Sequence, residues 1–242
     1  MLTCARLARK QNAQRTAPMT IAAKDGFTQM IDDSNAFFTE LARNNTKDWF
    51  SPRKEHYTAN IKKPAELFAE ILAEDFSQIS AAAHMPKLFR IYRDVRFSKD
   101  KTPLKAHLHI LWSQSSDAPF APAFFFGSDP SGISVGTGIM GLQGEALTRF
   151  RAFVDNWGDP LDEAIAASNL TPSEWGPPAL KKVPKPYDHD HPHAAHLKRK
   201  SLIISGPLDP DWRSHKAGLT GAVKDAFRKA QAFRTLLDER LG

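Results

Sequence analysis

The chain has 242 residues, enough for one large domain or two small ones. Its hydrophobic content of 41% is ordinary for a globular protein, and no run approaches the roughly 18 apolar residues that a membrane-spanning helix needs. The single cysteine, Cys4, excludes an internal disulfide framework and a cysteine-based zinc site. We therefore expect a cytoplasmic protein with no membrane partner.

The positive charge of the chain is concentrated at its beginning. The formal net charge is +6, but residues 1–24 contain five Lys and Arg residues and no acidic residue. Residues 25–242 therefore carry a net charge of only +1. Because proteins that bind nucleic acids depend on clustered positive charge, this balance disfavours a nucleic acid as the partner.

Residues 1–24 are expected to form a disordered tail. Their Arg-rich, acid-free composition resembles a mitochondrial presequence, which would imply import into mitochondria. The interpretation that we favour is a start codon assigned too far upstream, with Met19 as the true start. Residues 25–242 are expected to form a single domain.

The first predicted element is a helix. Asp33 or Ser34 can cap its start, because short polar side chains accept hydrogen bonds from the first backbone N–H groups of a helix. The helix is expected to end near Asn44 and Asn45, since Asn tolerates the left-handed conformation that stops a helix. A short capped turn is predicted over residues 46–50.

A long amphipathic segment follows over residues 52–79. Its apolar residues recur at helical spacing, which predicts a helix with one face on the core. Pro64 lies inside this segment and is expected to kink the helix or divide it in two, because proline lacks the backbone N–H that a helix uses.

The middle of the chain has short β-forming runs separated by Pro, Gly, Ser and Asp, which is typical of an antiparallel sheet. Strands are predicted over residues 88–97, 107–112, 121–126, 133–139 and 200–205. Further helices are predicted over residues 145–157, 161–168 and 216–241. This order predicts an α+β fold, with an antiparallel or mixed central sheet and the N- and C-terminal helices packed on one face.

The most informative stretch is residues 90–105, where many charged side chains lie among aromatic and β-branched ones. If residues 89–97 formed one extended strand, Arg93 would stand in the middle of an apolar row. Because a guanidinium keeps its charge inside a protein, Arg93 would then need a carboxylate, backbone carbonyls or a bound anion. Residues 98–103 favour a turn that would place lysines beside Arg96.

We interpret this stretch as an anion-binding site for a small phosphate or carboxylate ligand, since Arg offers paired hydrogen bonds and Lys a point charge. The candidate anion-binding residues are Arg90, Arg93, Arg96, Lys99, Lys101 and Lys105. The candidates for orienting these cations, or for acid and base chemistry, are Asp94, Asp100, His107 and His191.

The same residues resemble the hallmark of the DUF2461 family, a group of mainly bacterial proteins with no established activity. The matching positions are Arg90, Arg93, Asp94, Arg96 and Phe97, followed by Asp100 and Lys101. Further matches are Asn44-Asn45, Trp49-Phe50 and Asp190-His191-Pro192, whereas Leu104 stands where the family usually has Tyr. The resemblance spans most of the chain from Phe37 onwards and implies no substrate, cofactor or partner.

Other interpretations stay open. A metal-assisted or acid/base hydrolase could use the carboxylates and histidines of this site on a phosphorylated substrate. A structural role would make the stretch a buried Arg–Asp network. The histidine-rich residues 188–196 fit no standard metal motif, so no metal site is predicted. The sequence determines neither a cofactor nor an oligomeric state.

Overall fold

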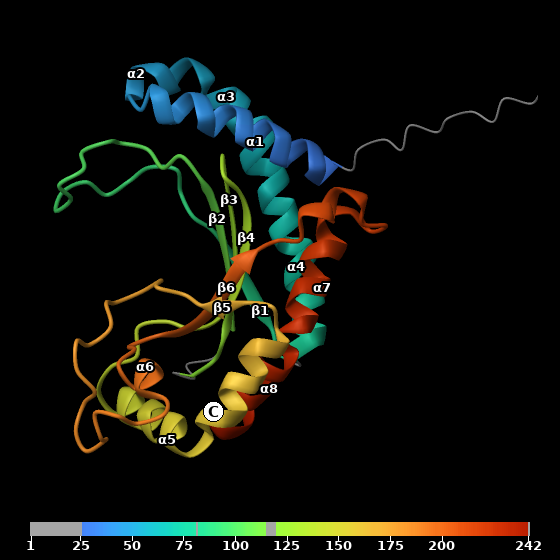
Figure 1. The fold of residues 1–242 in the computed structure, drawn as a ribbon. Helices are drawn as coiled ribbons and strands as arrows, with labels where there is room; N and C mark the ends of the chain where they lie inside the picture. Colours follow the sequence, from blue (N-terminus) through green and yellow to red (C-terminus); the bar gives the residue numbers. More distant parts are fainter. Residues whose placement is uncertain (1–25, 81, 115–119, 242) are drawn as a thin grey trace, which may run out of the picture.

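The computed structural model describes residues 26–80, 82–114 and 120–241, so the predicted tail over residues 1–24 lies outside the described residues. Its centre is a six-stranded sheet with the strand order β1-β2-β3-β4-β6-β5, in which every neighbouring pair is antiparallel (Figure 1). The strands are β1 (His84–Leu88), β2 (Leu108–Gln114), β3 (Ala123–Asp129), β4 (Gly132–Ile139), β5 (Thr171–Pro172) and β6 (Leu202–Pro207).

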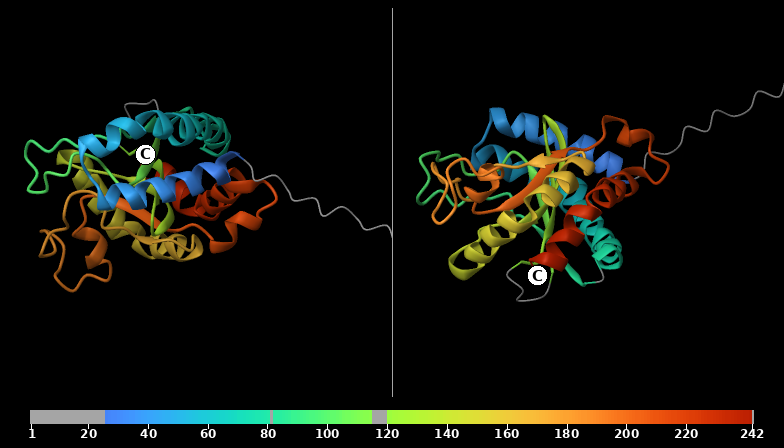
Figure 2. Two further views of the ribbon diagram at one scale, coloured as in Figure 1. Left: turned by 90° about the horizontal axis from the view of Figure 1, so that it is seen from above. Right: turned by 60° about the horizontal axis from the view of Figure 1, so that its bottom comes forward.

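Helices from both ends of the chain cover one face of this sheet, as Figures 1 and 2 show. The α-helices are α1 (Gly26–Arg43), α2 (Lys47–Phe50), α3 (Lys54–Tyr57), α4 (Lys63–Ser80), α5 (Gly144–Ala167), α6 (Ala194–Leu197), α7 (Gly218–Lys229) and α8 (Gln231–Arg240). Shorter helical turns are η1 (Ser51–Arg53), η2 (Thr58–Lys62) and η3 (Pro210–Ser214). The arrangement confirms the predicted α+β fold.

Alternating side chains along the strands explain why the helices pack on one face. In β2, Ile110 and Trp112 are buried, while His109, between Leu108 and Ile110, points to the opposite face of the sheet. Phe124 of β3 stacks on Phe76 of α4 with ring centroids 4.2 Å apart. Because successive side chains of a strand point to opposite faces, the core takes one set and the other set is left to line the opposite face.

The first helix begins earlier than predicted. α1 already includes Gly26, so the prediction that Asp33 or Ser34 caps its start is wrong. Ser34 is fully buried inside α1. Met30 and Ile31 are buried one turn before it, and their packing extends the helix towards the N-terminus.

The end of this helix and the short turn after it are confirmed. α1 ends at Arg43, directly before the Asn pair. The side chain of Thr46 then caps α2 by accepting a hydrogen bond of 3.2 Å from the Trp49 backbone N–H. Thr46 therefore caps the next helix as a short polar residue is expected to, whereas neither Asn44 nor Asn45 adopts the left-handed conformation that was expected to end α1.

The long amphipathic segment is divided next to Pro64, as predicted. The turn η2 is π-helical, and the backbone N–H of Lys63 donates to the carbonyl of Thr58, five residues back. Pro64 has no N–H with which to continue the usual pattern of bonds four residues back. π-helical turns are rare and are frequent at functional sites.

The single strand predicted over residues 88–97 is wrong. β1 ends at Leu88, and the backbone N–H of Phe89 makes a last hydrogen bond of 3.0 Å to His109. Residues 89–107, called the arm below, then leave the sheet and double back on themselves, joined by one isolated bridge between Tyr92 and Leu104.

Short acidic side chains explain why the arm is not a strand. The carboxylate of Asp94 accepts a hydrogen bond from the backbone N–H of Arg96, and that of Asp100 accepts one from Thr102. Such local bonds compete with a strand ladder and favour turns. The expected apolar row is also absent, since Phe97 is 96% exposed.

The helices of the C-terminal half are divided at two points. The two helices predicted over residues 145–157 and 161–168 are joined in α5, and Trp157 (φ −130°, ψ 24°) is not helical, so the predicted break is present as a kink shortly before Pro160. The proline removes a helical hydrogen bond at the kink. The C-terminal helix is instead divided at Ala230 into α7 and α8.

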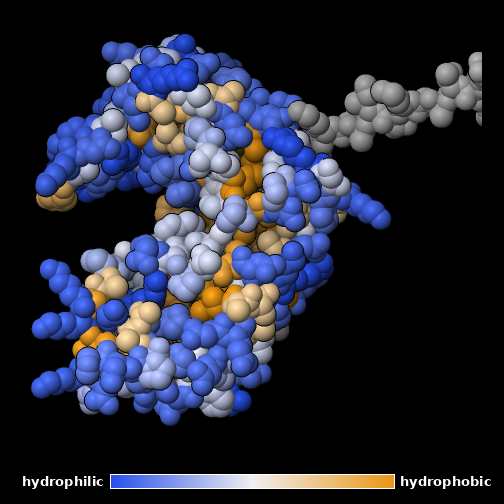
Figure 3. Space-filling view, in the orientation of Figure 1, coloured by the Kyte–Doolittle hydropathy of each residue, from blue (hydrophilic) through white to orange (hydrophobic). Residues whose placement is uncertain are grey.

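The face of the sheet opposite the helices is hollow. The arm projects from one end of this face, and residues 173–200, called the opposing loop below, project from the other end (Figure 1). The space-filling view shows a deep recess between these two projections (Figure 3). This recess, called the cleft below, places the arm and the outward-facing strand residues on one surface.

Candidate functional site

The outer half of the arm is held together by Arg93. Its guanidinium donates to the carboxylate of Asp100 and to the hydroxyl of Thr102. The hydrogen bond from Arg93, followed by those from Thr102, lowers the pKa of Asp100 to about 2. Arg93 therefore has the carboxylate partner that its charge requires, and this partner comes from the arm itself.

Arg96 forms a second, separate ion pair. Its Nε and Nη2 donate to the two carboxylate oxygens of Asp94 at 2.9 and 2.6 Å. This paired hydrogen bonding lowers the pKa of Asp94. The side chain of Arg96 is 76% exposed and that of Asp100 is 53% exposed. The alternative of a buried Arg–Asp network is therefore wrong.

The two lysines near the tip of the arm are also exposed. Lys101 donates from its amino group to the backbone carbonyl of Val95 at 3.0 Å, which closes the turn. Lys99 lies beside this turn, fully in solvent contact. Arg93, Arg96 and Lys101 thus stabilise the shape of the arm, and their binding of an external anion stays a prediction.

The base of the arm has a different balance of charge. Lys105 is half-buried, and its pKa is lowered first by burial and then by the nearby charges of Arg90 and Arg93. Its amino group lies 5.4 Å from the ring centroid of Phe89, and Lys87 lies 5.5 Å from the same ring. In the part of the chain that the structure describes, Lys87, Arg90 and Lys105 form no ion pair with a carboxylate.

Two histidines continue this surface into the cleft. The rings of His107 and His109 stack with centroids 4.0 Å apart. Burial, the neighbouring imidazole and Lys105 lower the pKa of His109 to about 4, and burial and Lys105 also lower the pKa of His107. Both rings are therefore neutral at pH 7 and can donate or accept hydrogen bonds.

A glycine makes room for this arrangement. Gly127 of β3 pairs with His109 of β2. A Cβ atom at Gly127 would lie 3.2 Å from the His109 ring and 2.7 Å from the hydroxyl oxygen of Ser134. The missing side chain lets the imidazole lie against the sheet.

Apolar side chains form the wall next to the histidines. A cavity of about 330 Å³ lies between the arm and the opposing loop. Its principal lining residues are Phe89, His109, Leu111, Phe125, Met140 and Trp175. Phe125 and Trp175 meet with ring centroids 5.9 Å apart, so the sheet and the opposing loop both contribute to the wall. The site therefore combines an apolar cavity with adjacent unpaired cations.

Asn45 holds the base of the arm in position, a role that the sequence did not reveal. Its side-chain amide donates to the backbone carbonyl of Leu104 at 2.8 Å and accepts from the Leu104 N–H at 3.1 Å. These two bonds fix the residue directly before Lys105. The Asn pair was noticeable in the sequence, but its partner is 59 residues away.

His191 lies on the other side of the cleft from the arm. It belongs to the opposing loop, and its Nε2 is 3.1 Å from a carboxylate oxygen of Asp155 in α5. His193 and His196 both pair with Asp162 of the same helix, at 3.0 and 2.8 Å. The fold thus gives these histidines carboxylate partners and separates His191 from the cations of the arm.

The His–Asp pairs do not form a metal centre. Within residues 26–80, 82–114 and 120–241, no three His, Cys, Asp or Glu side chains are grouped so that they could hold a metal ion.

A Cβ atom at Gly158 would lie 2.0 Å from the His193 ring, so this glycine lets the opposing loop approach the kinked α5.

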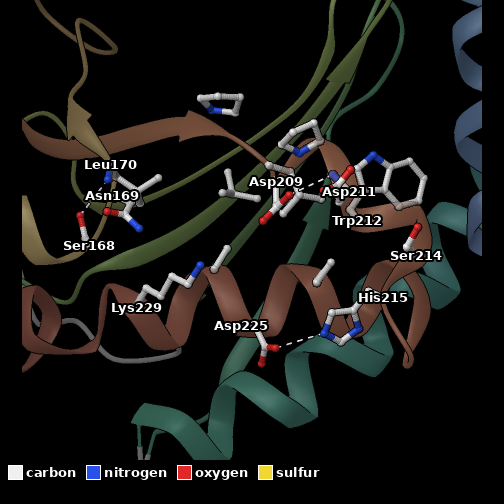
Figure 4. A pocket seen from close by; sticks show the side chains of 16 residues that line it. Ser168, Asn169, Leu170, Asp209, Asp211, Trp212, Ser214, His215, Asp225 and Lys229 are labelled. Atoms are coloured by element: carbon white, nitrogen blue, oxygen red, sulfur yellow. Dashed lines mark hydrogen bonds and ion pairs between the residues drawn. The ribbon is translucent and has the colours of Figure 1, made fainter.

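A larger cavity of about 510 Å³ lies between the β5–β6 edge and α7 (Figure 4). Its polar groups bind one another. The carboxylate of Asp225 is 3.1 Å from His215 and 2.8 Å from Arg228, and Asp209 accepts from the backbone N–H of Asp211. Lys229, Asp209 and Asp211 also line the cavity and form no ion pair among the described residues, so this cavity carries charges of both signs, in contrast to the base of the arm.

The comparison with protein families agrees with the elements described above. The profile of the family described as "Conserved hypothetical protein (DUF2461)" matches residues 33–235, which is most of the chain. The chain belongs to the DUF2461 family. The matched range of this DUF2461 protein includes the whole arm and the whole opposing loop, and therefore both sides of the cleft.

No curated protein matches the sequence of this DUF2461 protein. Within its described residues, no helix combines the length and the hydropathy that a bilayer span requires.

Proposed function

We propose that the protein binds a small organic anion in the cleft, with the phosphate or carboxylate of the ligand at the base of the arm. The observation that carries this proposal is the partly buried side chain of Lys105, which has Arg90 and Arg93 as its charged neighbours. Burial and like charge both disfavour its protonated form, and a bound anion would offset both effects.

The apolar wall supports a ligand with an apolar body. A cavity of about 330 Å³ is within the range of small-molecule sites, which are mostly apolar with a few polar groups that orient the ligand. Phe89 borders this cavity and also lies under the amino groups of Lys87 and Lys105. A ligand can therefore contact the apolar wall and the cations at the same time.

The proposal divides the candidate residues by role. Arg90 and Lys105 supply the charge, and His107 and His109 offer neutral hydrogen-bonding groups beside it. Arg96 and Lys101 serve the shape of the arm, and Lys99 is exposed and takes neither role. The anion-binding role that the sequence suggested is thereby shifted from the tip of the arm to its base.

The test is calorimetric titration of the protein with phenyl phosphate and, in parallel, with inorganic phosphate. Phenyl phosphate is expected to bind more tightly, because its ring occupies the apolar wall. Lys105→Met should weaken binding about tenfold or more, as expected for the loss of a charge-assisted contact, whereas Lys99→Met should leave it unchanged. Equal affinities of Lys105→Met and the unaltered protein, or no saturable binding, would overturn the proposal.

A second candidate function, hydrolysis of a phosphate ester, is favoured by the neutral His109 beside the cations. A neutral imidazole can orient an attacking water molecule by accepting a hydrogen bond from it, and cations stabilise the developing negative charge. The measurement is release of nitrophenol from p-nitrophenyl phosphate. His109→Gln should abolish it, while His189→Gln, a change at a side chain that is 95% exposed, should not. Absence of activity in the unaltered protein would contradict this candidate.

A further inference from the structure

A second cavity lies on the helix-covered side of the sheet, next to the cleft but separated from it by the first residues of the arm. Its volume is about 320 Å³. It is lined by residues 88–92 on one side and by residues of α2, α3, η2 and α4 on the other. Phe89 borders both this cavity and the cleft. We call it the π-turn pocket, after η2.

Aromatic rings form the wall of the π-turn pocket. Phe50 lies between Tyr57 and Tyr92, with ring centroids 5.7 and 5.8 Å away. Tyr92 is 42% exposed, so one side of this wall is open to a ligand. Edge-to-face contacts of this kind suit a further planar ring.

A tyrosine hydroxyl without a protein partner opens into this pocket. The side chain of Tyr57 is only 6% exposed, and it lines the pocket. Among the residues that the structure describes, none hydrogen-bonds to its hydroxyl, and the hydroxyl oxygen is not one of the fully buried atoms, so a ligand in the pocket can reach it. Burial and the nearby Glu66 raise the pKa of Tyr57 to about 12, so the hydroxyl remains a donor at neutral pH. Buried tyrosine hydroxyls usually find a hydrogen-bond partner.

The charges around the pocket favour an anion as that partner. Lys54, Lys62, Glu66 and Arg90 line it. Lys62 and Glu66 pair with each other at 2.8 Å. The remaining two cations, Lys54 and Arg90, have no ion pair with any carboxylate of the described residues. The pocket therefore has an excess of positive charge beside an unused donor.

We propose that the π-turn pocket is a second binding site, which takes an aromatic carboxylate. The ring of the ligand would pack against Phe50 and Tyr92, and its carboxylate would accept a hydrogen bond from Tyr57 and face Lys54 and Arg90. The π-helical turn begins at Thr58, directly after Tyr57, and so sets the position of this donor in the wall. This site does not use Lys105, although it shares Phe89 and Arg90 with the site proposed in the cleft.

The experiment uses the fact that the chain has three tyrosines. Tyr57 and Tyr92 line the pocket, and Tyr187 lies in the opposing loop as an internal control. In protein labelled with ¹³C in its tyrosine rings, benzoate should shift the signals of Tyr57 and Tyr92 saturably and leave that of Tyr187 unchanged. Benzamide, which is neutral, should cause no shift at the same concentrations.

Variants make the test specific. Tyr57→Phe removes one oxygen atom. The affinity for benzoate, measured from the shift of Tyr92, should fall about tenfold or more in this variant and should not change in Tyr187→Phe. Lys54→Met, a change at an exposed position, should also lower the affinity for benzoate. Unchanged affinity in both Tyr57→Phe and Lys54→Met, or no shift of Tyr92 by benzoate, would overturn the inference.

Lys105→Met distinguishes this site from the cleft. The shifts of Tyr57 and Tyr92 should persist in that variant, because Lys105 does not line the π-turn pocket. Loss of these shifts in Lys105→Met would overturn the second site and assign the effect to a ligand in the cleft. Failure of phenyl phosphate to bind would overturn the proposed function alone.

Discussion

The arginines of the arm and one arginine of α8 find partners for their charge in opposite ways. On the arm, Arg93 and Arg96 pair with carboxylates that are seven and two residues away, and both pairs are open to solvent. Arg234 of α8 is only 1% exposed and has no carboxylate pair among the described residues. Its Nη1 instead donates to the carbonyl of Pro122 at 3.1 Å and to the hydroxyl of Thr137 at 2.9 Å.

The difference shows that a dense run of charges need not be the most demanding electrostatic site in a protein. The charged arm supplies its own counter-ions. The guanidinium of Arg234 lies 3.9 Å from the ring centroid of Phe124, and its Nε and Nη2 are buried without a hydrogen-bond partner among the described residues. Burial lowers the pKa of Arg234 to about 10. The costly charge is therefore in the core.

The largest effect is expected from Arg234→Ala. This change removes two hydrogen bonds and leaves a cavity under α8, so the free energy of unfolding should fall by about 2–4 kcal/mol. Arg234→Met keeps most of the volume and removes the buried charge, so it should lose much less. Urea denaturation of both variants is the measurement, and equal losses would show that the guanidinium, not the packed volume, stabilises the core.

A smaller loss of folding stability is expected when the pH is lowered. Burial, and then the charge of Arg234, lower the pKa of His84, which also contacts Phe124. The folded pKa lies below the unfolded one of about 6.5, so the stabilising contribution is complete above pH 6.5 and is lost as the pH falls below it. His84→Gln should therefore reduce the loss of stability between pH 7 and pH 5, measured by urea denaturation at each pH. An unchanged pH dependence would contradict this account of the core.

Asn45→Ala tests how the arm is anchored and should have an intermediate effect. It removes both hydrogen bonds to Leu104, so the free energy of unfolding should fall by about 1–2 kcal/mol. Amide hydrogen exchange should become faster at Leu104 and Lys105 and remain unchanged in β3 and β4. Asn60→Ala is a suitable control, because the Asn60 side chain bonds only to exposed His56. Unchanged exchange at Leu104 would contradict the anchoring role.

Arg93→Ala and Arg96→Ala should have the smallest effect on stability. Exposed ion pairs contribute little, because water and salt already screen the charges. Thermal unfolding should barely change, although the arm should lose order near Asp100 and Thr102. A loss as large as that of Arg234→Ala would restore the interpretation of the arm as a stabilising network.

Much of the fold could be predicted from local pattern, and the site only in part. The β-forming runs of β2, β3, β4 and β6 and the cap at Thr46 are encoded within a few residues. The arm was mistaken for a strand, because turn-forming bonds from Asp94 and Asp100 outweigh the β-forming residues around them. Arg234 bonds to Thr137 and Pro122, which are 97 and 112 residues away in the sequence. A local sequence pattern cannot predict contacts over such separations.

The central claim is that the base of the arm holds an uncompensated positive charge that an organic anion neutralises. The most direct test is an NMR titration of the Lys105 amino group with and without phenyl phosphate. The account predicts a pKa below the ordinary lysine value in the free protein, and a rise when phenyl phosphate binds. An ordinary pKa in the free protein, or a pKa that phenyl phosphate leaves unchanged, would contradict it.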